Sequence, residues 1–186
     1  ALRSDLSADV AEVALKSLEA TGELSYKADS PLGPHWALTG AGQSKILVLL
    51  SEELDSAGTR VLLTRTYEQF FGANRELLEL CTDWQTLPCD DPERSIINDH
   101  TDQDYDSSVI ARLVAFNERM QATYAEFATQ LERLAGYGLR FSRAVERVKA
   151  GDYDWFDRSS IDSYHTVWNE MHYNLQSTLG IDRTAE

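Results

Sequence analysis

The chain has 186 residues, of which 42% are apolar and 26% are charged, and it contains four tryptophans and eight tyrosines. This composition indicates a folded protein of one or two small domains and excludes a largely disordered chain. The sequence has no run of about 18 apolar residues, so we expect no membrane span. Its formal net charge of −14 argues against DNA binding, because affinity for DNA comes largely from Lys and Arg side chains that neutralise phosphates.

Both parts of the chain are acidic. Residues 1–58 hold four basic and nine acidic side chains, a net charge of −5, and residues 59–186 hold the other 13 basic and 22 acidic side chains, a net charge of −9. An acidic chain can still bind DNA if one of its faces is basic, so the distribution of charge matters more than the total. Here charge disfavours duplex DNA as a partner without excluding it.

The first predicted helix begins after Ser7, which is a good N-cap residue. Asp9 and Glu12 follow in the first turns, where the helix dipole favours acidic side chains. Gly22 is typical of the residue at which a helix ends. Four apolar residues lie close together in angle and predict the packed face of this helix, namely Val10, Ala14, Leu15 and Leu18.

Residues 23–38 predict a β-hairpin, because two short alternating stretches flank a tip at residues 27–34 that is rich in Asp, Gly and Pro. Thr39 then caps a helix of about residues 40–55, which ends in residues 55–58. We therefore place a domain boundary between residues 58 and 59. The core face of this second helix is expected to be Ile46, Leu47, Leu49 and Leu50.

The helix, the hairpin and the "WALTGAG" run of Trp36–Gly42 together resemble the winged helix-turn-helix transcription regulators of the MarR/PadR class. The resemblance covers about residues 6–57 and lacks the first two helices of that domain. It implies that the helix of residues 8–21 is the recognition helix and that the hairpin is the wing, with Lys27 at its start and His35 near its base. It implies DNA contacts from Ser7, Ala8, Glu12, Lys16, Lys27 and His35.

Two features depart from this class. Six residues precede the first helix, so we expect either upstream sequence that supplies the two missing helices or a shortened fold. The helix face that would meet DNA also carries Asp9, Glu12 and Glu19 against Lys16 alone, and carboxylates repel phosphates. The alternative function is therefore an acidic protein-interaction module that has a winged-helix shape and has lost DNA binding.

The rest of the chain has helical period throughout, which predicts a helical bundle and makes the whole protein mostly α, in an α+β class. A polar loop is expected at residues 83–103. The predicted helices are residues 62–82, a long helix of residues 105–134 stopped by Gly136 and Gly138, residues 139–150, and a last helix capped by Asp157 or Ser159 and ended by Gly180.

The long apolar stripes of these helices need to be buried against partners. An intrachain bundle core accounts for most of the apolar residues. A homodimer seam is a further expectation, since a regulator that reads two DNA half-sites is a dimer. The side chains that suggest this seam are Phe116, Met120, Phe127, Trp168 and Met171.

His165 and His172 lie seven residues apart on the last helix, so they project from nearly the same side. This spacing is too long for two ligands of one metal without help from other helices, so no metal is assigned. The open alternatives are a polar edge of the bundle and a pocket for a small-molecule effector or a metal. The pocket would be lined by Tyr164, His165, Trp168 and His172, and His100 could join it.

The remaining motifs point to no chemistry. The run Asp102–Asp106 lacks the glycine and the final acidic ligand of a calcium loop, so it is expected to cap the long helix. No nucleophile elbow, phosphate loop, dinucleotide fingerprint or zinc-protease motif occurs, and we expect no enzyme and no cofactor. Cys81 and Cys89 are expected to be reduced thiols of a cytoplasmic protein, with a disulfide between them as the alternative.

Overall fold

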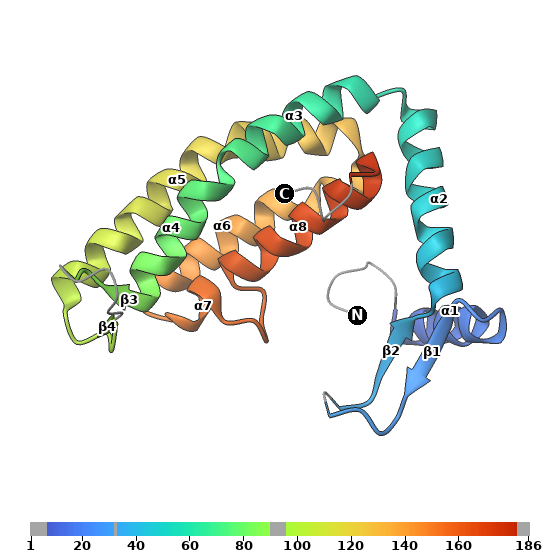
Figure 1. Ribbon diagram of the computed structural model, residues 1–186, viewed down its shortest axis with the longest axis horizontal. Helices are drawn as coiled ribbons and strands as arrows, with labels where there is room; N and C mark the ends of the chain where they lie inside the picture. The colour runs from blue at the N-terminus through green and yellow to red at the C-terminus, as the bar shows by residue number, and fades with distance from the viewer. Residues whose placement is uncertain (1–6, 32, 90–95, 182–186) are drawn as a thin grey trace. The chain divides into compact units, whose positions relative to one another are not determined.

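The computed structural model describes residues 7–31, 33–89 and 96–181. It divides the chain into two compact units, Ala1–Glu53 and Leu54–Glu186, so the boundary predicted after residue 58 falls inside the second unit. The protein is mostly helical with short antiparallel strand pairs, as Figure 1 shows, and the predicted mostly α class is confirmed. Within the described residues, no helix has both the length and the apolar character that a membrane crossing requires.

The N-terminal unit consists of α1 (Ala8–Ala20), β1 (Leu24–Lys27), β2 (His35–Leu38) and most of α2 (Gly40–Ala57). The predicted cap is confirmed, because Ser7 Oγ accepts a hydrogen bond from the Val10 N–H at 3.4 Å. Gly22 follows the end of α1 with a φ of +79°, a conformation that favours glycine. The strands pair in an antiparallel register from Leu24 opposite Leu38 to Lys27 opposite His35, which confirms the predicted hairpin.

The base of the hairpin is tied to α2 by Thr39 and Gly42. Thr39 Oγ1 donates to the carbonyl of Gly22 at 2.6 Å and accepts the N–H of Gly42 at 3.1 Å, so it caps α2 as predicted. A Cβ atom at Gly42 would lie only 2.0 Å from the Glu23 carbonyl oxygen. The first turn of α2 therefore rests directly on the hairpin backbone, and Gly42 permits this approach.

The core face predicted for α2 is wrong. Ile46, Leu47 and Leu49 are each at least 40% exposed, and Val10 of the predicted α1 face is 52% exposed. Among the described residues of this unit, no apolar side chain is buried. Ile46 and Leu49 instead face an apolar recess that Leu18, Leu24 and Leu38 also line, and these few side chains leave the recess open instead of closing it into a core.

The C-terminal unit is a helical bundle (Figure 1), and it has its own core of buried side chains. The long helix α5 packs against α3, α4 and α6, and α8 packs against α3, α6 and the short helix α7. Its elements are α3 (Arg60–Gly72), α4 (Asn74–Gln85), β3 (Thr86–Leu87), β4 (Ile96–Ile97), α5 (Gln103–Gln130), a 3₁₀ turn (Glu132–Leu134), α6 (Gly136–Lys149), α7 (Asp154–Asp157) and α8 (Tyr164–Leu179).

The single helix predicted over residues 62–82 is two helices, α3 and α4, which meet at Ala73. The Ala73 N–H bonds to the carbonyl of Phe70 at 3.1 Å, so the last turn of α3 is tightened. Gly72 has low helix propensity, and the side chain of Asn74 accepts a hydrogen bond from Trp168 Nε1 at 2.8 Å. The break therefore combines a weak helix former with a contact from a distant helix.

Three further boundaries were predicted wrongly. The helix α5 ends at Gln130 because Leu131 is extended, and Gly136 begins α6 instead of stopping α5. The last helix is capped by Ser163, whose Oγ accepts the Thr166 N–H at 3.2 Å, and not by Asp157 or Ser159. The loop predicted at residues 83–103 contains the paired strands β3 and β4, and its residues 90–95 lie outside the described part of the chain. Gly180 ends α8 as predicted, with a φ of +71°.

The apolar side chains that suggested a dimer seam belong to the core of a single chain. All five are at most 7% exposed, so they present no surface to a second copy.

The two cysteines are free thiols, as expected. Burial raises the pKa of the Cys81 thiol to about 12, whereas Cys89 is exposed.

We predict opposite effects of an added methyl group at two glycines of the first turn of α2. Gly42→Ala forces the helix and the hairpin apart, whereas a Cβ at Gly40 meets no atom within 4 Å and improves helix propensity. Hydrogen exchange followed by mass spectrometry should therefore speed up across residues 23–50 in Gly42→Ala and stay equal or slow down in Gly40→Ala. Equal exchange in the two variants would contradict the contact with Glu23.

We predict that Trp168→Ala lowers the free energy of unfolding of the helical unit by about 3–5 kcal/mol, because it leaves a cavity and removes the partner of Asn74. Urea denaturation followed by circular dichroism measures this change. The control is Val61→Ala on α3, where the side chain is 82% exposed and the expected change is below about 0.5 kcal/mol. An effect of Trp168→Ala as small as that of the control would contradict the described core.

Candidate functional site

The predicted contact residues of α1 lie on its exposed surface. Ser7, Ala8, Glu12 and Lys16 are all exposed in the structure. Glu19 is exposed as well, and its carboxylate accepts the backbone N–H of Tyr26 at 3.3 Å, which links α1 to the first strand of the hairpin. The outer face of α1 and the adjoining hairpin therefore form one accessible surface.

The hairpin places Lys27 and His35 opposite each other at the end nearest its tip. His35 therefore lies where the tip joins the strands, beside Lys27, because β2 begins at His35 after the turn residues Gly33 and Pro34. Lys27 is exposed and His35 is half-buried. His35 Nδ1 donates to the Gly33 carbonyl at 2.9 Å, since a carbonyl only accepts, so Nδ1 is the protonated nitrogen.

The basic charge on α1 is compensated within the helix. Lys16 Nζ lies 2.6 Å from Glu12 Oε1, and both side chains are more than 60% exposed. The hydrogen bond between them, followed by the charge of the partner, lowers the pKa of Glu12 and raises the pKa of Lys16. A phosphate that approaches Lys16 would therefore compete with Glu12, in addition to meeting the charges of Asp9 and Glu19.

The tentative effector pocket on α8 consists largely of core residues. Tyr164 and Trp168 are at most 1% exposed, and His172 is 9% exposed with its Nε2 3.1 Å from the hydroxyl of Tyr67. His165 is half-buried and contacts Asn169 through Nε2 at 3.2 Å. Three of these four side chains are therefore packed against neighbouring protein atoms.

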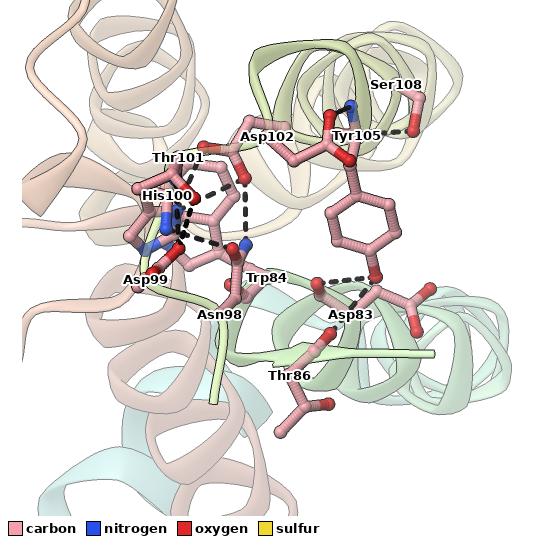
Figure 2. Close-up of polar contacts among 11 residues, drawn as sticks. Asp83, Trp84, Thr86, Asn98, Asp99, His100, Thr101, Asp102, Tyr105 and Ser108 are labelled. Carbon is pink, nitrogen blue, oxygen red and sulfur yellow. Dashed lines mark hydrogen bonds and ion pairs between the residues drawn. The ribbon is translucent and has the colours of Figure 1, made fainter. Parts of the chain in front are cut away.

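A polar cluster that the sequence analysis did not assemble lies where β4 leads into α5 (Figure 2). The carboxylate of Asp106, in the first turns of α5, lies 3.1 and 3.2 Å from His100 Nδ1 through its two oxygens. Asn98 Nδ2 donates to the same carboxylate at 2.8 Å and to the carbonyl of Trp84 at 3.0 Å. The side chain of Asp106 is only 3% exposed, so these donors compensate a buried charge.

His100 is held in an uncommon conformation by this cluster. Its φ is +59°, which a residue with a side chain adopts at a cost, and its N–H donates to Asn98 Oδ1 at 3.0 Å. Its ring lies against the indole of Trp84, with 4.3 Å between ring centroids. Figure 2 also shows Asp102, which caps α5 as predicted by accepting the Tyr105 N–H at 3.0 Å.

This arrangement orients an imidazole through a buried carboxylate, which is the geometry that proton-transferring histidines use. The His100 side chain is 33% exposed, and within the described residues its Nε2 makes no hydrogen bond. The cluster also joins α4, the segment before α5 and α5 itself. The cluster therefore holds these segments together. It also holds the His100 ring in a fixed position where the ring is partly accessible.

Metal binding has no support in the part of the chain that the structure describes, where no three His, Cys, Asp or Glu side chains gather as ligands would. His100 and Asp106 form a pair without a third ligand group.

Comparison of the chain with protein-family models, curated proteins and solved structures finds no match. The function is therefore inferred from the geometry within each unit.

We predict that Asp106→Asn destabilises the helical unit by about 1–3 kcal/mol, because the new amide brings a donor towards His100 and Asn98, which are donors themselves. Asp104→Asn is the matched control, since both residues lie in the first turn of α5 and lose the same charge, and Asp104 is exposed. Its expected cost is at most about 0.5–1 kcal/mol through the helix dipole. Thermal and urea unfolding measure both changes, and equal losses would contradict a role for the buried carboxylate.

Proposed function

We propose that this protein is a transcription regulator similar to the MarR/PadR class and that α1 and the β1–β2 hairpin contact duplex DNA. One observation carries the proposal: α1 is followed by a hairpin whose base is fixed to the next helix by Thr39 and Gly42. A helix with an exposed outer face beside an antiparallel hairpin is the arrangement that a winged-helix domain presents to DNA. In this proposal α1 enters the major groove and the hairpin is the wing.

The helical unit would then serve dimerisation, effector sensing or both. It has an independent aromatic core, so it can fold as a separate body and carry a second role. A homodimer would match two DNA half-sites. Its interface would use side chains other than the five buried ones from which a seam was first predicted.

The charge of α1 favours a second candidate, an acidic protein-interaction module that keeps this architecture without binding DNA. Lys16 is paired with Glu12, and Asp9 and Glu19 add negative charge on the same helix. The unit also exposes apolar side chains on α2, including Leu47 and Val48, which are 49% and 55% exposed. Exposed apolar groups that occur together are typical of protein interfaces.

We predict weak binding to duplex DNA with a shallow salt dependence, since each phosphate contact contributes only about 0.9 to the slope of log K against log salt. Glu12→Gln with Glu19→Gln should strengthen binding by roughly five- to tenfold at low salt, because it removes repulsion and frees Lys16. Lys16→Gln with Lys27→Gln should weaken binding and flatten the slope. Fluorescence anisotropy of a labelled duplex at several salt concentrations measures these changes.

The control for this experiment is Glu68→Gln with Glu118→Gln, which changes the net charge equally on exposed positions of the helical unit. It should leave the affinity within about twofold, because neither side chain belongs to α1 or the hairpin, which make the proposed contacts. Tight binding with a steep slope would mean that another, basic surface contacts DNA. If neither the unchanged chain nor the Glu12/Glu19 variant binds, the interaction module becomes the better function.

A further inference from the structure

The recess between α1 and the outer part of the hairpin has a composition that suits a positively charged ligand. It is lined by three charged residues of α1, Glu12, Lys16 and Glu19, and by the two aromatic residues Tyr26 and Trp36. Its volume is about 380 Å³, which is enough for a small organic molecule or one long side chain. All five residues belong to the N-terminal unit, so the recess is formed without the helical unit.

The aromatic wall is built by the pairing of the strands. Tyr26 and Trp36 lie directly opposite each other in the hairpin, and their ring centroids are 5.1 Å apart at an angle of 52°. Tyr26 remains 48% exposed and Trp36 is half-buried. Accessible faces of Trp and Tyr attract cations electrostatically, and Trp does so most strongly.

The charged wall adds a net negative charge. Lys16 compensates Glu12 at 2.6 Å, and Glu19 has no basic partner within the described residues. Glu19 Oε1 is held next to the aromatic pair because it accepts the Tyr26 N–H. Two carboxylates and one ammonium leave a formal charge of −1, which repels anions and is neutralised by one monovalent cation.

We propose that this recess binds one organic monocation, of the quaternary ammonium or guanidinium class, on the rings of Tyr26 and Trp36 and beside the carboxylate of Glu19. The aromatic faces accept the weakly hydrated charge that these groups carry, and Glu19 supplies the opposite charge. The inference concerns α1 and the hairpin alone and does not depend on DNA binding. If DNA does bind this face, the cation would lower its negative charge and thereby favour the contact.

The test uses choline as the probe and 3,3-dimethylbutanol, its neutral analogue of equal shape, as the reference compound. Choline should shift the indole N–H signal of Trp36 in a ¹⁵N-edited NMR titration at constant ionic strength, and the shift should saturate. The signals of Trp84 and Trp168, which are at most 3% exposed, should not move. The neutral analogue should produce no saturable shift at the same concentrations.

Two variants separate a cation site from a structural role of the same residues. Glu19→Gln should weaken choline binding by about fivefold, because it removes an exposed charge. Lys16→Gln should strengthen binding, since it removes a resident ammonium and leaves two uncompensated carboxylates. Glu52→Gln, an exposed change on α2 of the same unit, is the control and should leave binding unchanged.

The proposal is overturned if choline and its neutral analogue shift Trp36 alike, if choline binding does not saturate, or if Lys16→Gln weakens it. The backbone amide signals of the hairpin and the Trp36 indole signal without choline report whether the N-terminal unit of each variant is folded, because the other tryptophans belong to the helical unit. None of these measurements involves DNA, so the cation site and the proposed regulator function can fail separately.

Discussion

The helical unit depends on one buried indole ring. Trp168 of α8 stacks on Phe70 of α3 with 4.0 Å between ring centroids, and it also contacts Phe116 of α5 and Phe141 of α6. Its N–H donates to Asn74 at the start of α4. This single side chain on α8 thus contacts residues of four other helices. Its indole N–H has a hydrogen-bond acceptor, as the N–H of a buried tryptophan usually does. This hydrogen bond lies at the break between α3 and α4 and joins the first residue of α4 to α8.

Local signals in the sequence were sufficient for most of the elements but not for the boundaries that distant contacts determine. Ser7, Gly22 and Thr39 act through neighbours within a few residues or through backbone conformation, so their roles were predicted correctly. Gly136 and Gly138 were misread as a helix stop. A Cβ at Gly138 would lie 3.3 Å from the Cβ of Tyr124 on α5, so this glycine allows two helices to approach, which periodicity does not reveal.

The candidate sites were predictable to different extents. The contact positions on α1 follow from the resemblance, and Ser7, Glu12 and Lys16 are exposed in the structure, but exposure does not distinguish them because no residue of α1 is buried. The cluster of His100 and Asp106 was missed because a left-handed histidine has no signature in sequence. One signal was present: Asp106 precedes Val109 by three residues and Leu113 by seven, so helical period places its carboxylate on the buried face. A charged residue on such a face requires partners, which His100 and Asn98 supply in the structure.

The absence of buried apolar side chains from the described residues of the N-terminal unit has a consequence for cooperativity. Helix caps, turns and the hydrogen bonds between the two strands hold this unit together. Such contacts add little to the free energy of local unfolding, whereas the aromatic core of the other unit adds much more to it. We therefore expect the hairpin and α1 to open at a lower free energy than the helical core. A ligand that binds only α1 and the hairpin would then slow their opening more than it slows opening of the helical core.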